Sequence, residues 1–400
     1  MTSEWKTSPL RDLVGFISKG IAPSYADEES ETTVRVLNQK CNRNFRITYS
    51  ESRLHDLARK KVPAERFVRI DDILINSTGA GTAGRIAQIC NLPCDTIVDG
   101  HMIIIRANDK VSQKYLGYAM KAHQWEVLQL DEGSTGQTEL NRERLLDEIM
   151  ISYPTSFALQ ETIVKTLEGI DRKLLINEKV NDNLMEQALT LYTTHFTTLE
   201  KNGCIGDYCS IKSGFAFKSS WWTDSGIKVI KIGSINQDNL NLLECSYVDE
   251  NKINKVNDFK VRAGDLLIAM TGATIGKFAM VPYSSETLLV NQRVGKFFLG
   301  NKPVEKLPFI YCTLKQPDVY YEIVNRGQGS AQPNISGSDI MSIPCVIPSK
   351  EAIDEFNCIN QPLFDLIISN QRENQQLSKI RDTILPKLMS GELDVSDIDL

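Results

Sequence analysis

The sequence has no excess of basic residues and no long apolar run. Its 400 residues carry 45 lysines and arginines against 51 aspartates and glutamates, which gives a formal net charge of −6. A chain-wide positive charge, typical of many nucleic-acid binders, is therefore missing, although a local basic surface would suffice for binding. No apolar run reaches the roughly 18 residues of a transmembrane helix. The first residues lack the apolar core of a signal peptide, so we expect a cytoplasmic protein.

Cysteine and histidine are too scattered for a metal site. The nine cysteines are odd in number and form no C-x-x-C pair, and with four histidines they show no zinc-ligand spacing. We expect reduced thiols and no bound metal. The histidines, for each of which we expect a structural or surface role, are His55, His101, His123 and His195.

The sequence also lacks the common catalytic motifs. It contains no phosphate-binding P-loop, no H-E-x-x-H, no G-x-S-x-G and no N/D-P-P-aromatic tetrapeptide of an amino-methyltransferase. One string, Gly79 to Gly84, fits the nucleotide-binding pattern G-x-G-x-x-G. A strand-like segment follows it instead of a helix, and its counterpart at 272–276 lacks the middle glycine. We interpret it as a turn between strands and keep a nucleotide-dependent enzyme as an alternative.

What the sequence does contain is a repeat with an offset of 193 residues, which places Asp72 opposite Asp265. DDILINSTG at 71–79 resembles GDLLIAMTG at 264–272. Both halves hold short strand-like segments bounded by Gly, Asn, Asp and Pro, with one short helical stretch each. We therefore expect two tandem α+β domains, at 1–157 and 203–350.

A long heptad pattern ends each half. Residues of one seam recur every seven positions and repeat at the same offset: Ile163, Ile170, Asn177, Leu184 and Leu191, then Phe356, Leu363, Asn370, Leu377 and Ile384. A second seam adds Asn181 and Asn374. Such spacing predicts a coiled coil, in which seam asparagines specify register at a cost in stability. Two ordinary amphipathic helices on globular cores are the alternative.

From these heptads we predict two long spacer helices, at 158–202 and 351–390. We expect them to pack on each other as an antiparallel coiled coil related by a pseudo-twofold axis. Pro386 should end the regular part of the second helix, because proline lacks the amide proton that a helix interior needs. Gly391 is a helix stop, after which 391–400 forms an acidic tail.

One stretch is locally basic. Between residues 35 and 69, ten lysines and arginines stand against three acidic residues, with aromatic residues interleaved. Such a surface suits phosphate binding, and a solvated, partly paired face is the alternative. The second half is less basic. Its aromatic group is interpreted as mainly structural, and consists of Phe215, Phe217, Trp221 and Trp222.

The chain resembles the specificity (S) subunits of type I restriction-modification systems over essentially its whole length. The resemblance rests on SGFAFKSSWW (213–222), IKVIKIGSI (227–235), GDLLIAMTGATIGKFAMV (264–281), NQRVG (291–295) and ILPKLMSGEL (384–393). In the first half, ISKGIAPSYAD (17–27) is a weak echo of the first string.

The resemblance implies two target recognition domains held apart by the coiled coil. Each would read one half of a gapped, bipartite sequence in double-stranded DNA. The helices would dock the methyltransferase (modification) subunits, two per S subunit, and through them the restriction subunits. This chain would be non-catalytic, with S-adenosylmethionine, ATP and Mg²⁺ on the partner subunits. A coiled-coil scaffold without a DNA role is the other alternative.

Residue type and loop position select ten candidate DNA contacts. Lysine and arginine bind phosphates, whereas serine, threonine and arginine also read base edges. The candidates are Arg35, Lys40, Arg43, Arg46, Ser77, Thr78, Lys218, Lys231, Thr271 and Arg293.

Overall fold

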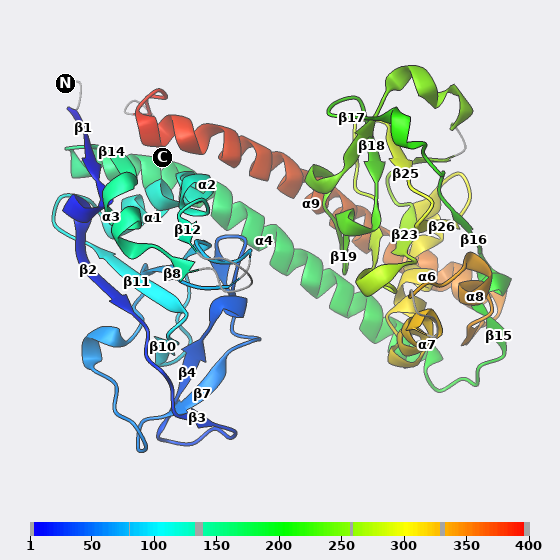
Figure 1. Ribbon diagram of the computed structural model, residues 1–400. Helices are drawn as coiled ribbons and strands as arrows, with labels where there is room; N and C mark the ends of the chain where they lie inside the picture. Colours follow the sequence, from blue (N-terminus) through cyan, green and yellow to red (C-terminus); the bar gives the residue numbers. More distant parts are fainter. Residues whose placement is uncertain (1–3, 80, 133–138, 257–258, 329–332, 396–400) are drawn as a thin grey trace. The chain divides into compact units, whose positions relative to one another are not determined.

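The computed structural model describes residues 4–79, 81–132, 139–256, 259–328 and 333–395 (Figure 1). The chain divides into two compact units, Met1–Asp171 with Lys379–Leu400 and Arg172–Ser378. Each unit contains one globular α+β domain together with parts of both long helices. No described helix is long and apolar enough to cross a membrane.

The first domain is built on two four-stranded sheets, ordered β2-β11-β8-β9 and β10-β4-β7-β3. Their strands are Val14–Lys19 (β2), Met102–Ala107 (β11), Ile73–Asn76 (β8), Ile86–Gln88 (β9), Thr96–Val98 (β10), Thr33–Leu37 (β4), Arg53–Asp56 (β7) and Tyr25–Ala26 (β3). Three two-stranded pairs join Trp5–Pro9 (β1) with Met150–Pro154 (β14), Asn42–Arg43 (β5) with Arg46–Ile47 (β6), and Asp131–Glu132 (β12) with Glu139–Leu140 (β13). The helices are Gln113–Ala122 (α1), Gln124–Val127 (α2) and Arg142–Glu148 (α3).

The second domain repeats this plan. Its sheets are ordered β16-β26-β23-β24 and β17-β21-β18-β25-β22, so both keep the order of the first domain and one gains an edge strand. The strands are Ser210–Ser213 (β16), Val294–Phe298 (β26), Leu266–Ala269 (β23), Phe278–Met280 (β24), Trp222–Thr223 (β17), Ser246–Val248 (β21), Ile227–Ile230 (β18), Leu288–Val290 (β25) and Lys260–Val261 (β22). Gly203–Cys204 (β15) pairs with Pro344–Cys345 (β27), and Ile235–Asn236 (β19) with Asn239–Leu240 (β20). The helices are Ile205–Tyr208 (α5), Leu307–Leu314 (α6), Pro317–Gln328 (α7) and Gly337–Met341 (α8).

Two glycines explain the weak echo between the starts of the two domains. The amide of Gly20 donates to Met102 O at 2.9 Å, and that of Gly214 donates to Val294 O at 3.0 Å. A Cβ atom would lie 2.0 Å from a carbonyl oxygen at Gly20 and 2.2 Å from one at Gly214, so no larger residue fits without backbone movement. The two strings are therefore structurally equivalent although they share few residues.

The two long helices begin at equivalent positions of the repeat. They are Phe157–Phe196 (α4) and Lys350–Ser390 (α9), and the seam residues are all buried or half-buried. The first helix is shorter than predicted, because Phe196 packs into the second domain's core and Leu199 N bonds Phe196 O at 3.1 Å, closing a turn. The prediction that Pro386 ends the regular helix is wrong. Pro386 is exposed while Leu385 and Leu388 beside it are buried, so core packing holds the helix together through the proline.

The asparagine seam confirms the antiparallel pairing. Within the second unit, Asn177 Nδ2 donates to Asn374 Oδ1 at 2.8 Å, and Asn370 Nδ2 donates to Asn181 Oδ1 at 2.9 Å. The repeat offset of 193 maps Asn177 onto Asn370 and Asn181 onto Asn374, so each bond is the counterpart of the other, as a pseudo-twofold axis requires. Seam amides that bond each other, here Asn177 and Asn370 buried and their partners half-buried, fix helix register, since a slip would leave them unpaired.

The helices also pack on the globular cores. Ile163 and Leu167 of α4, with Leu385 and Leu388 of α9, join the core of the first domain. Gly391 ends α9 as predicted, with a φ of 77°. In the predicted tail, residues 392–394 are exposed, whereas Val395 is only 3% exposed and packs into this core. Residues 396–400 of that tail lie outside the described residues.

Candidate nucleic-acid interface

Loops from distant parts of the first domain meet at the end of β8. The hydroxyl of Thr78 lies 2.7 Å from His101 Nδ1 and 3.4 Å from Gln39 Oε1. Thr78 also forms an isolated antiparallel bridge with Glu139. We call this group, Thr78, His101, Gln39 and Glu139, the first loop cluster. Ser77 is only 1% exposed, so its side chain faces the protein interior rather than a surface ligand.

The second domain assembles its loops in the same way. Thr271 forms the equivalent bridge with Asn334, and Met270 N bonds Arg293 O at 3.0 Å, as Ser77 N bonds His101 O at 2.8 Å. The buried Oγ1 of Thr271 has no hydrogen-bond partner among the described residues. Arg293 is exposed, so its guanidinium is accessible at this end of the domain.

Sequence reasoning did not select His101 or Gln39. The sequence did contain an indication for His101, because the alignment of Val98-Asp99 with Val290-Asn291 places His101 opposite the selected Arg293. Gln39 could be recognised only in space, since the loop that carries it is far from Thr78 in sequence. The other histidines are held by the protein, as expected. Buried His55, for example, accepts Ser24 N–H at Nδ1 at 2.8 Å.

The basic stretch is partly paired and partly open. Arg35 pairs with Glu29, Arg53 stacks 3.4 Å above the ring centroid of Tyr25, and Lys60 donates to a backbone carbonyl. Lys40 and Arg43 are exposed, and their side chains make no hydrogen bond or ion pair with any described residue. Of the first domain's candidates, these two are the cations most available to a phosphate. Arg46 is half-buried and has a partner within the protein.

The two candidate lysines of the second domain also differ from each other in how available they are to a phosphate. Lys218 is exposed, whereas the Lys231 ammonium lies 3.8 Å above the ring centroid of Trp222. The aromatic group packs against a small buried cluster that includes Val229 and Val248, as expected for structural residues. Lys231 is therefore held over a fixed ring, an arrangement that still leaves an ammonium proton for a phosphate.

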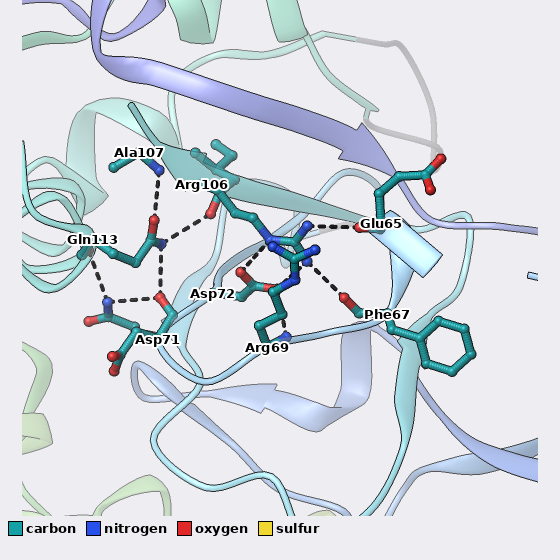
Figure 2. Close-up of polar contacts among 10 residues, drawn as sticks. Glu65, Phe67, Arg69, Asp71, Asp72, Arg106, Ala107 and Gln113 are labelled. Carbon is teal, nitrogen blue, oxygen red and sulfur yellow. Dashed lines mark hydrogen bonds and ion pairs between the residues drawn. The ribbon is translucent and has the colours of Figure 1, made fainter. Parts of the chain in front are cut away.

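A buried ion pair anchors the last part of the basic stretch (Figure 2). Arg106 on β11 binds both carboxylate oxygens of Asp72, at 2.7 and 2.8 Å, and donates to the carbonyls of Glu65 and Phe67. The Asp72 carboxylate also accepts the amide of Arg69, at 2.8 Å. These bonds hold the backbone of the basic segment against the sheet. In the second domain, Asp265 occupies the position of Asp72.

We expect Arg106→Met to lower the opening free energy of this sheet by about 3–5 kcal/mol, because it leaves the Asp72 carboxylate buried and unpaired. Hydrogen exchange of the β8 and β11 amides measures this energy. The control is Arg11→Met, which removes an arginine with an exposed side chain paired to Glu143 and Asp147 and should leave the opening free energy nearly unchanged. Equal losses in the two variants would contradict the assigned anchoring role.

The glycine-rich string is a turn, as interpreted. It joins β8 to β9, which pair antiparallel, so no helix N-terminus follows it to receive a phosphate. Gly79, Gly81 and Gly84 have φ values of 116°, 67° and 83°, a backbone region open mainly to glycine. The alternative of a nucleotide-dependent enzyme thereby loses its structural basis. Ala80 of this string lies outside the described residues.

Two similar domains, each with the same bridged loop framework and each packed on parts of the long helices, define a protein built by internal duplication. A family model described as the type I restriction modification DNA specificity domain matches residues 2–186 and again 200–379. The chain therefore belongs to the specificity subunits of type I restriction-modification systems and contains two recognition domains.

Individual relatives agree with this assignment. The type I restriction enzyme MjaVIII specificity subunit of Methanocaldococcus jannaschii is 22% identical over 99% of this chain and 94% of its own length. The HindI specificity subunit of Haemophilus influenzae is 33% identical over 30% of this chain and 26% of its own. The crystal structure of a type I S subunit from M. genitalium shares the fold, with a TM-score of 0.54 at 17% identity, covering 99% of this chain and 98% of that one.

Proposed function

We propose that the two recognition domains bind double-stranded DNA and that each reads one half of a gapped, bipartite target. The observation that carries this proposal is a repeated loop framework with different side chains. The first loop cluster presents Gln39 and His101 where the second domain has Ile232 and Arg293. Side chains that differ in hydrogen bonding select different base edges, so the two half-sites would differ in sequence.

The paired helices are proposed to set the spacing of the half-sites and to dock the modification subunits, two per chain. The docking proposal is supported by a set of apolar side chains that are exposed on both helices within the second unit. Leu175 and Ile176 on α4 are 41% and 44% exposed, and Ile359 and Leu366 on α9 are 56% and 45% exposed. Contiguous exposed apolar surface marks protein interaction sites, and Ile359 and Leu366, seven residues apart, share one face of α9. The modification subunits would recruit the restriction subunits.

We propose that the chain itself is non-catalytic. Its relatives are named as specificity subunits. S-adenosylmethionine would then bind the modification subunit, and ATP and Mg²⁺ the restriction subunit. In this scheme the chain contributes sequence recognition and geometry, and its partners contribute the chemistry.

Salt-dependent DNA binding tests this function and separates it from a scaffold without a DNA role. We expect Lys40→Ala and Arg43→Ala each to weaken binding to target and scrambled duplexes alike. Each should also reduce the slope of log affinity against log salt by about 0.9, the effect of losing one phosphate contact. Lys6→Ala, at an exposed position on β1, is the matched control and should leave the slope unchanged. DNA affinity that does not depend on salt would contradict the proposal.

A further inference from the structure

Two short hairpins occupy equivalent positions in the repeat. β5 and β6 form the first, and β19 and β20 the second. Each turn contains a non-glycine residue with positive φ, Phe45 at 61° and Asp238 at 65°. Such a conformation is unfavourable for a side chain as bulky as phenylalanine, and persists only where the surroundings hold it.

In the second domain the hairpin turn is held through a carboxylate. Tyr311 on α6 donates its hydroxyl to Asp238 Oδ1 at 2.5 Å, and Lys315 pairs with the other carboxylate oxygen. The long helix α9 contributes as well, because Gln371 Nε2 donates to the backbone carbonyl of Asp238 at 3.1 Å. Burial, followed by the nearby Asp238 charge, raises the pKa of Tyr311 well above its ordinary value, so its proton remains available as a donor.

In the first domain the carboxylate lies on the long helix instead. Asp171 of α4 accepts the Tyr118 hydroxyl at 2.9 Å and lies 3.4 Å from the Lys121 ammonium. That ammonium lies 5.0 Å from the ring centroid of Phe45 in the hairpin turn. Arg381 of α9 adds a further bond to Asp171 at 3.0 Å. Burial opposes the charged carboxylate, but these partners together lower the pKa of Asp171.

The repeat offset shows that the two arrangements are counterparts. It maps Tyr118 onto Tyr311, Phe45 onto Asp238, and Asp171 onto Phe364. Phe364 of α9 packs edge-on against Tyr311, with ring centroids 5.5 Å apart. Aspartate and phenylalanine have therefore exchanged places between hairpin and long helix, while the tyrosine remains in position. A lysine completes each group, although the two lysines are one position out of register in the repeat. We call these groups the hairpin junctions: Phe45, Tyr118, Lys121 and Asp171 in the first domain, and Asp238, Tyr311, Lys315 and Phe364 in the second.

We propose that each hairpin junction is a positioning element that sets the angle of its recognition domain on the long helix and so restricts the gap lengths the protein accepts. This inference rests on the proposed function. A carboxylate bound by a hydroxyl and an ammonium is directional, whereas ring contacts alone allow sliding. In the first junction this carboxylate lies on α4 itself, and in the second it holds the hairpin turn whose backbone carbonyl Gln371 of α9 binds. The junction residues act through the placement of the domain and need not touch DNA. Loosening a junction should broaden gap tolerance without weakening recognition of either half-site.

The test uses the chain assembled with its modification subunit and measures methylation of duplexes with the native gap and with gaps one base pair longer and shorter. Tyr311→Phe removes a single hydroxyl and Lys315→Met a single charge. Each should reduce the preference for the native gap about tenfold, the effect expected from one charge-assisted hydrogen bond. Adding Asp238→Asn to Lys315→Met removes the unpaired charge, retains an acceptor for Tyr311 and should restore part of the preference. Lys302→Met, at an exposed ion pair with Glu305 in the same domain, is the control and should change nothing.

Three results are informative in different ways. A preference that falls in both junction variants and recovers in the double variant supports the positioning role. Rates that fall equally for all three gaps, or a preference that does not change, would overturn it and leave the junction a stabilising contact only. A wild-type assembly that methylates no gapped target would refute the proposed function itself.

Discussion

Replacing residues 1–155 with the corresponding domain of another specificity subunit should change one half of the recognised sequence and leave the other half intact. The first and last strands of the domain, β1 and β14, pair antiparallel from Trp5↔Pro154 to Pro9↔Met150. The two ends of the exchanged segment therefore lie side by side. The loop cluster and the exposed Lys40 and Arg43 lie within this segment. Each base pair lost from the original half-site should cost about 1–3 kcal/mol, so the original target should no longer be bound selectively.

The exchange requires that the incoming domain packs on the long helices as the original domain does. Leu385, Leu388 and Met389 of α9 share the first domain's core, so the incoming domain must present a matching apolar surface. The matched control exchanges the second domain between β15 and β27, which should change the other half-site only. A change in both half-sites after a single exchange would refute independent reading by the two domains.

Lengthening both long helices by one heptad should increase the gap between half-sites by up to about three base pairs. Seven helical residues add about 10 Å at roughly 1.5 Å per residue, and B-form DNA rises about 3.4 Å per base pair. Insertions after Arg172 in α4 and after Ser378 in α9 leave both asparagine pairs in place. Seven residues preserve the seam, because the heptad is its repeat unit. Methylation of duplexes with stepwise longer gaps measures the result.

The control for this experiment lengthens α4 alone. Asp171 and Arg381 could then no longer face each other while the asparagine pairs are kept, so a bonded contact across the helices is lost. We expect this variant to lose methylation of every gapped duplex. An unchanged gap with full activity after the double insertion would contradict the role of the helices as a spacer.

The repeat and the helices could be predicted because they are encoded locally. Heptad spacing is visible along the chain, and equivalent asparagines at 177 and 370 indicated which helix faces meet. The error at Pro386 has a physical cause, since local propensity predicts a helix end where buried Leu385 and Leu388 maintain the helix. Tertiary packing of this kind does not appear in a local pattern.

The side-chain partnerships could not be predicted. Asp72 was recognised as a repeat position, but its bond to Arg106 depends on the pairing of β8 with β11. The hairpin junctions were harder to find, because the exchange of aspartate and phenylalanine makes equivalent positions look unrelated. Among the candidate DNA contacts, Ser77 shows the limit of selection by residue type, since its burial follows from the fold around it.

The most direct test of the central claim is a map of methylated adenines across the genome of the host, with this gene intact and with it deleted while the modification subunit is still expressed. We predict a gapped, bipartite motif with two different half-sites that is methylated in the intact strain and unmethylated after deletion. The same motif methylated in both strains, with no motif that depends on the gene, would contradict the assignment of target recognition to this chain.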